Sequence, residues 1–131
     1  MATLDEVAGL ALELPEVAEG ERHGGRTWGV RGKVFAWERP FSQADLKRFG
    51  AETPPAGPIL GIRTEDLNEK EALLAAHPGC CFTIPHFDGY AAVLVRLDNA
   101  PPAELRELLW DGWQACAPPA LAREHTRQTG S

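Results

Sequence analysis

The residue types that could do chemistry are concentrated in a basic stretch near the N-terminus. Between Arg22 and Trp37 the sequence holds four bases and no acid. Arginine and lysine at the tip and rim of a β-hairpin can reach phosphate oxygens, and phosphate contacts supply most of the non-specific affinity of proteins for nucleic acids. We therefore expect a nucleic-acid-binding site formed by Arg26, Arg31 and Lys33. The alternative is that bases at exposed strand ends provide solubility and protect the edge of a sheet.

A second group of residues has the composition of a zinc site. It comprises His77, the adjacent Cys80 and Cys81, and His86. Neighbouring residues on a strand point to opposite faces, so the two cysteines cannot both bind one ion without a bulge. The sequence also lacks the Cys-x-x-Cys pair that is typical of structural zinc sites. We therefore expect no metal site and no cofactor.

Residues for nucleophilic catalysis are equally poorly matched. Ser42 is explained as a helix cap, and Cys81 beside a histidine has no third group to orient the pair. Phosphate-cradling glycine motifs are absent from the sequence. We expect no catalytic residues, and we predict that the protein is not an enzyme.

Composition and charge bound the remaining possibilities. The 131 residues carry a net charge of −6, and the first 21 residues hold six acids and no base. An acidic balance argues against non-specific nucleic-acid binding, but the local basic stretch keeps that possibility open. No apolar run approaches the roughly 18 residues that a membrane span needs. Three cysteines, two of them adjacent, form a poor disulfide framework, and the N-terminus lacks a signal-peptide pattern, so we expect a cytoplasmic protein with no membrane contact.

The basic stretch needs a β-hairpin to position it. Two short apolar runs flank Arg31-Gly32, a pattern typical of a hairpin with a tight turn. Side chains alternate along a strand, so pairing Val30 with Lys33 sends alternate residues to one face. We expect the core-facing side chains to be Trp28, Val30, Phe35 and Trp37. The opposite face then carries the small side chains of Thr27, Gly29, Val34 and Ala36.

Helices and further strands are predicted around this hairpin. A capping box at residues 3–6 begins a helix that Pro15 ends, and residues 18–23 form a strand. A short helix begins at Ser42 and a proline-rich loop precedes Ile59. The later elements are expected as a strand at 59–63, a helix at 65–77, a second hairpin from strands 80–85 and 90–97, and a helix from about 101 to 116. In the second hairpin, the residues expected on one face are Cys80, Phe82, Ile84, Ala91, Val93 and Val95.

Runs of strands with helices between them indicate the fold class. We expect an α+β two-layer sandwich, in which a mainly antiparallel sheet has helices on one side. Residues 1–117 are predicted to form a single domain. Residues 118–131, which begin at a pair of prolines, are predicted to be a C-terminal extension with a flexible end.

Several short motifs resemble one known family. They are Leu14-Pro15-Glu16, the run from Val30 to Ala36, Ile84-Pro85-His86, and the closing group Glu104-Leu105, Leu108-Leu109 and Asp111-Gly112-Trp113. With the order of elements, these residues resemble the MmcQ/YjbR-like family over about residues 3–117. The resemblance implies a YjbR-like topology similar to secretion-chaperone domains, and DNA binding through two hairpin wings. In this chain the second hairpin carries only Arg96 against Asp88, so only the first hairpin is a basic wing.

Two functions follow as expectations. In the first, this uncharacterised MmcQ/YjbR-like protein is a DNA-binding module that uses its basic hairpin. The alternative is a protein- or small-ligand-binding domain that resembles the secretion-chaperone folds and performs no catalysis. The partner is accordingly DNA or another protein, and the sequence does not distinguish a monomer from a homodimer.

Overall fold

A six-stranded antiparallel sheet forms the frame of the molecule. The computed structural model describes residues 3–22, 25–39, 57–84 and 87–129, with side chains as far as residue 124. The strands lie in the order β1-β2-β3-β4-β6-β5. Their bounds are β1 Val17–Arg22, β2 Gly25–Val30, β3 Lys33–Glu38, β4 Ile59–Arg63, β5 Cys81–Phe82 and β6 Ala92–Arg96. The helices are α1 Leu4–Leu12, α3 Leu67–Ala76, α4 Pro102–Cys116 and α5 Pro119–Thr129, and a 3-10 turn spans Leu97–Asn99.

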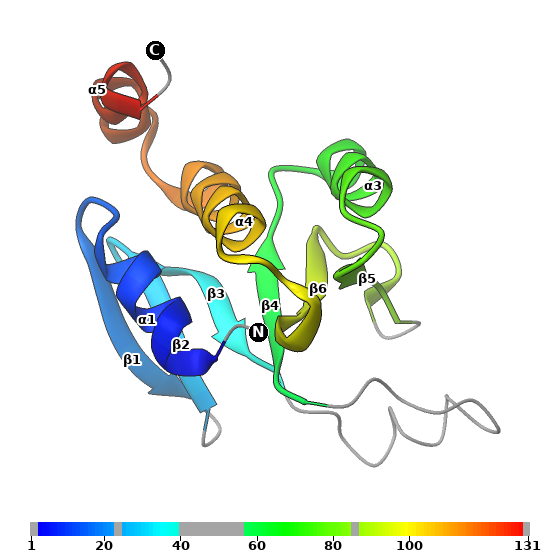
Figure 1. Cartoon of the computed structure of the whole chain (residues 1–131). Coiled ribbons are helices and arrows are strands. Elements are labelled where there is room, and N and C mark those ends of the chain that lie inside the picture. Colours follow the sequence, from blue (N-terminus) through cyan, green and yellow to red (C-terminus); the bar gives the residue numbers. More distant parts are fainter. Residues whose placement is uncertain (1–2, 23–24, 40–56, 85–86, 130–131) are drawn as a thin grey trace, which may run out of the picture.

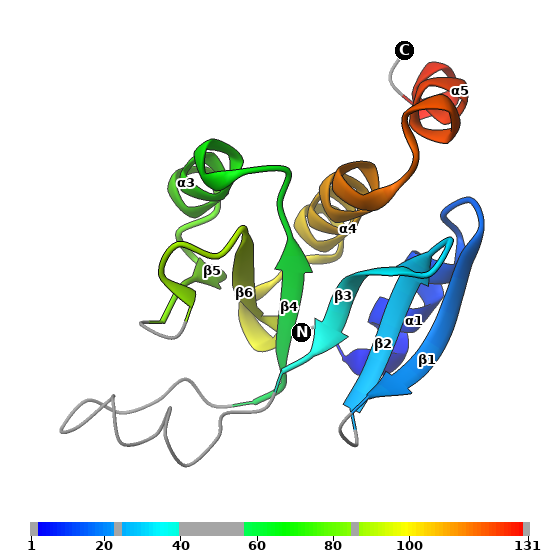
Figure 2. The same cartoon turned by 180° about the vertical axis from the view of Figure 1, so that it is seen from behind.

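Helices α1 and α4 lie across one face of this sheet, which we call the helix face (Figure 1). Helix α3 lies beside β5 and β6, and its Leu73 side chain packs in the main core between the sheet and the helices. The opposite face, which we call the far face, is turned toward the viewer in Figure 2 with α1 and α4 behind it. The α+β sandwich expected from the sequence is therefore confirmed. The predicted helix at 42–49 lies outside the described residues.

The main core lies between the sheet and the helices. Trp28, Val30 and Phe35 are fully buried there, as the sequence predicted. Leu105, Leu108, Leu109, Trp113 and Cys116 bring α4 onto the same core along one stripe. The Trp113 indole Nε1 donates to the Pro15 carbonyl at 2.9 Å, which ties α4 to the end of the α1 segment. Helix α5 was not predicted. It begins directly after Pro118, and its Leu121 side chain is buried in the same core.

The sequence-derived register of the first hairpin is wrong after its second pair. Val30 pairs with Lys33 and Gly29 with Val34, but Trp28 then pairs with Ala36 and Thr27 with Trp37. Phe35 is the extra residue of a β-bulge, which changes the face of every later side chain in β3. Ala36 consequently joins the helix face, whereas Trp37 points to the far face. Trp37 packs there against a second, smaller apolar cluster of Ile59, Ile84, Phe87, Ala92 and Leu94.

The register of the second hairpin also differs from expectation by one residue. Cys81 pairs with Val95 and Phe82 with Leu94, so Phe82 lies on the far face and not beside Val93 and Val95. The physical reason is the connection between the strands. Instead of a tight turn, residues 87–91 form a compact loop that places Phe87, 3% exposed, on the far-face cluster.

Gly61 shows how closely the Trp37 ring lies on β4. A Cβ at residue 61 would lie 2.5 Å from the Trp37 ring, well inside van der Waals contact. Both residues belong to one cross-strand pair of β3 and β4. The absence of a side chain at residue 61 therefore allows the indole to lie flat on the sheet.

We predict that Gly61→Ala destabilises the protein by about 1–3 kcal/mol, because a methyl group there overpacks a rigid aromatic ring. Urea unfolding followed by circular dichroism would measure the loss. Gly79→Ala is the matched control, since no atom lies within 4 Å of its added Cβ. Equal stability of the two variants would show that the ring is not pressed on β4.

Candidate anion-binding surfaces

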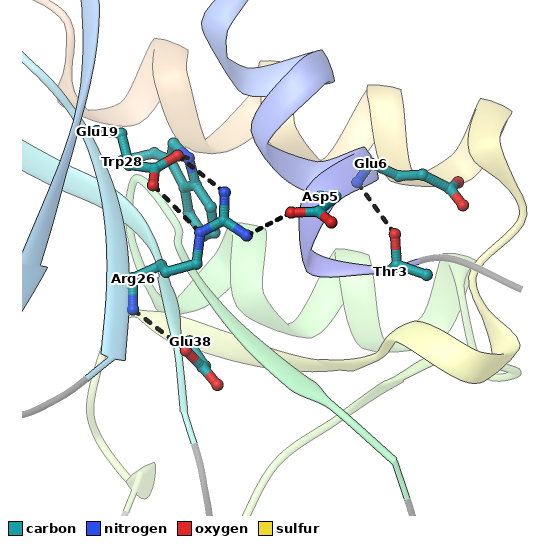
Figure 3. Close-up of polar contacts among 7 residues, drawn as sticks. All are labelled: Thr3, Asp5, Glu6, Glu19, Arg26, Trp28 and Glu38. Carbon is teal, nitrogen blue, oxygen red and sulfur yellow. Dashed lines mark hydrogen bonds and ion pairs between the residues drawn. The ribbon is translucent and has the colours of Figure 1, made fainter.

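Arg26, the first residue predicted to bind nucleic acid, already holds two carboxylates (Figure 3). Its Nε and Nη2 donate to the two oxygens of Glu19, each at 3.1 Å, and its Nη1 donates to Asp5 Oδ1 at 2.9 Å. The hydrogen bonds to Glu19 and Asp5 raise the pKa of the guanidinium. The reciprocal bond from Arg26 lowers the pKa of Glu19, which also accepts the Trp28 indole N–H at 3.0 Å. A phosphate would have to displace these acids from Arg26.

Arg31, at the hairpin tip, is paired in the same way. Its Nε and Nη2 donate to the two carboxylate oxygens of Glu16 at 2.8 and 2.9 Å. Both residues have a left-handed backbone, with φ of 47° at Arg31 and 57° at Glu16. Arg31 and Gly32, whose φ is 85°, therefore form the two centre positions of a primed hairpin turn. The ion pair joins the tip of β2–β3 to the segment between α1 and β1.

Lys33 differs from the two arginines. Its side chain is exposed, and no hydrogen bond or ion pair of this residue is found in the described part of the chain. The structure thus places all three predicted residues on one hairpin but leaves only Lys33 without a carboxylate. Their binding of nucleic acid stays a prediction. The neutralising acids all come from the acidic first 21 residues, a pairing that the opposite charges of two adjacent segments could have suggested.

A second set of bases, not predicted from the sequence, lies on the far face. Alternation along β1, β4 and β6 sends Arg22, Arg63 and Arg96 to this face, and Arg39 follows directly after β3. The acids within the described strands take the other face: they are Glu19, Glu21 and Glu38. The far face of the described strands therefore carries cations and no acid, whereas the helix face carries the three acids together with Arg26 and Lys33. The loop over this face adds one exposed acid, Asp88.

Aromatic rings accompany these far-face arginines. The Arg39 guanidinium lies 5.6 Å from the centre of the Phe87 ring, and that of Arg63 lies 5.4 Å from the centre of the Tyr90 ring. Arg63 Nη1 also donates to the Tyr90 hydroxyl at 3.2 Å. Phe87 stacks on Trp37 with centroids 6.5 Å apart and meets Tyr90 edge-on at 5.4 Å. Cations and π-faces therefore alternate along this surface.

Two guanidinium groups on the far face have unmet hydrogen-bonding capacity. The Nε atoms of Arg63 and Arg96 are buried, and neither has a hydrogen-bond partner in the described structure. Buried N–H groups in folded proteins nearly always have an acceptor, so an unpaired one calls for an explanation such as an absent ligand or water. Because both Nε atoms are buried, an anion on this face would supply that acceptor once the Arg63 and Arg96 side chains turn toward it.

The thiols and histidines of the described residues do not form a metal site. Cys80, Cys81 and Cys116 are free and buried, and burial raises the pKa of each thiol. They are therefore protonated and poor nucleophiles. No group of three potential metal ligands occurs in the described residues. His86 of the considered zinc set lies outside them.

Among the described carboxyl groups, Asp111 on α4 has the pKa that is shifted furthest from its ordinary value. Burial, together with the nearby Glu69 and Glu107, raises its pKa to about 6. On the same side of α4, His77 Nδ1 lies 3.2 Å from Glu104 Oε1, which joins the end of α3 to α4. The charged form of Asp111 is thus disfavoured in the folded protein, where acids of two helices meet.

We predict that Arg31→Asn raises the melting temperature by about 3 °C, because asparagine accepts the left-handed conformation of this turn position. Arg31→Ala, which loses the same ion pair but keeps the backbone strain, should not raise it. Thermal unfolding followed by circular dichroism would measure both variants. A higher melting temperature for the alanine variant would contradict this reading of the turn.

Asp111→Asn should stabilise the protein at about pH 8 by roughly 1 kcal/mol, a figure reduced for solvent screening. The folded pKa is higher than the unfolded one, so ionisation lowers stability as pH rises from about 4 to about 6. The advantage of the variant should therefore vanish near pH 4. Urea unfolding at both pH values would measure it, and Glu107→Gln should shift the transition of Asp111 to lower pH. A pH-independent advantage would contradict the assignment.

Comparison with known proteins identifies the family. The model of the YjbR family matches residues 12–115. The uncharacterised protein Rv2570 of Mycobacterium tuberculosis strain H37Rv and the uncharacterised protein Mb2600 of Mycobacterium bovis are each 44% identical to this chain, with 99% of this chain and all of the relative covered. The crystal structure of Deinococcus radiodurans protein DR2400, of the domain family DUF419, has the same fold, with a TM-score of 0.64, 20% identity and coverage of 99% of this chain and 89% of that one. No helix among the described residues could cross a membrane. The chain belongs to the YjbR family.

Proposed function

We propose that this chain is a binding domain without catalytic activity, and that it binds an anionic ligand on the far face of its sheet. The observation that carries the proposal is the unmet guanidinium N–H of Arg63 and Arg96. Charge-assisted hydrogen bonds from arginine are strongest to carboxylate and phosphate oxygens. We also propose a reducing, cytoplasmic location. The protonated, buried and free thiols fit that location and a non-catalytic role.

The far face supports this role better than the basic hairpin does. On the hairpin, Arg26 and Arg31 each donate two hydrogen bonds to a single glutamate, so ligand binding there must first break existing ion pairs. On the far face, Arg22, Arg63 and Arg96 make no ion pair with any described residue. A phosphate there does not have to displace a carboxylate from these arginines.

DNA binding through the hairpin is the second candidate. The exposed Lys33 favours it, because its ammonium has no carboxylate partner in the described part of the chain. Arg31 also lies at an exposed tip, where its side chain could exchange Glu16 for a phosphate. A single unpaired base gives a weak interaction, with a shallow log–log salt slope of only about −0.9.

The two surfaces can be separated by binding of inorganic polyphosphate to the full chain at low salt. We expect a far-face variant, with Arg22, Arg63 and Arg96 changed to Gln, to lose at least about tenfold in affinity. A hairpin variant, with Arg26, Arg31 and Lys33 changed to Gln, should bind as the wild type does. Isothermal titration calorimetry would measure all three proteins, and circular dichroism would check that each is folded.

Loss of binding in the hairpin variant alone would transfer the site to the hairpin. Failure of the wild-type chain to bind polyphosphate at low salt would overturn the proposal that the far face is an anion site.

A further inference from the structure

We infer that the ligand of the far face is single-stranded nucleic acid, whose phosphates meet the arginines and whose bases stack on the neighbouring aromatic rings. The inference rests on the proposed function and names the class of anionic ligand. It concerns a surface on the opposite side of the sheet from the Arg26 ion pairs, so it is independent of the hairpin.

The arginines lie in a row across the strands. Arg22 pairs with Gly25, Arg39 donates its backbone N–H to the Ile59 carbonyl, and Ile59 pairs with Arg96. Adjacent strands lie about 4.8 Å apart, so the backbones of Arg22 and Arg96, four strand spacings apart, are separated by roughly 19 Å. Arg63, four residues beyond Ile59, lies roughly 13 Å from this row. One small anion cannot reach all of these groups, whereas an extended polyanion can.

The row directly beside the arginine row contains two aromatic rings, those of Trp37 and Phe82. Strand pairing aligns six residues in one line across all six strands of the sheet: Gly20, Thr27, Trp37, Gly61, Leu94 and Phe82. Successive rows on one face are two residues apart, or about 6.8 Å. Trp37 and Phe82 are half-buried in this row, and Tyr90, 40% exposed, stands beside it over Arg63. Cations and ring faces are thus neighbours, the combination that binds unpaired nucleotides.

The far face suits a single strand better than a duplex. Bases in a duplex are stacked on each other and offer only their edges in the grooves. Rings that lie on a sheet can stack only on bases that are not so occupied. The N-terminal half of this face carries small residues, Ala18, Gly20 and Thr27 among them, so it presents no ridge that would enter a groove.

A buried lysine fixes the loop that carries the exposed ring. Lys70 of α3 is 5% exposed, and its Nζ donates to the carbonyls of Phe87 and Tyr90 at 2.6 and 2.9 Å. These bonds hold the loop against the sheet before any ligand arrives. Pre-ordering of this kind lowers the entropy that binding must overcome.

The test is fluorescence anisotropy with a labelled single-stranded oligonucleotide of about 12 nucleotides, a length that covers a typical site. Wild-type protein should bind with a log–log salt slope near or steeper than about −2, from three arginines at roughly −0.7 each. The triple variant of Arg22, Arg63 and Arg96 to Gln should flatten the slope toward zero. Tyr90→Ala should weaken binding of the oligonucleotide at least about fivefold, whereas Tyr90→Phe, which keeps the ring, should not.

Inorganic polyphosphate and a duplex of the same sequence separate the outcomes. If Tyr90→Ala weakens binding of the single strand but leaves polyphosphate binding unchanged, ring stacking is supported. Equal binding of polyphosphate and single strand, with no effect of Tyr90→Ala, would overturn the inference while leaving the proposed anion site intact. Tighter binding of the duplex than of the single strand would also overturn it. A wild-type chain that binds none of the three would remove the inference and the proposed function together.

Discussion

The β-bulge at Phe35 is the constraint on which both faces of the sheet depend. By inserting one residue opposite the Trp28–Gly29 step, it keeps Phe35 and Ala36 on the helix side and turns Trp37 to the far side. Without it, strict alternation would bury Trp37 under α4 and leave Gly61 uncovered. The bulge thus provides one aromatic ring for each of two separate apolar clusters. By alternation it also places the side chain of Arg39, which follows β3, on the far face.

Much of the architecture follows from local patterns in the sequence. The N-cap at Thr3, the Arg31-Gly32 turn and the apolar stripe of α4 are each encoded within a few residues, and each was predicted correctly. The bulge and the register of the second hairpin were not. Both depend on where Trp37 and Phe87 pack, and these two side chains come together from segments that are 50 residues apart. Tertiary packing therefore decided the registers, and alternation alone could not.

The candidate sites show the same division. The sequence revealed an acidic segment beside a basic one, and the structure folds the first onto the second through Asp5, Glu16 and Glu19. The surface whose arginines make no ion pair with a described residue was not apparent, because Arg22, Arg63 and Arg96 lie on three strands that are far apart in the sequence. Single arginines in apolar strands carry no local signal. Only the register of the sheet shows that they share a face.

The distribution of the four indoles has a spectroscopic consequence. Trp110 and Trp113 stack with centroids 5.0 Å apart and planes at 14°, close enough for their excited states to couple. Trp28 and Trp113 are fully buried on the helix side, whereas Trp37 lies alone among the indoles on the other side. The near-ultraviolet circular dichroism of the native protein should consequently be dominated by the α4 pair. Quenching by a water-soluble agent, in contrast, should act first on the half-buried Trp37 and Trp110, one on each side of the sheet, and last on the fully buried Trp28 and Trp113.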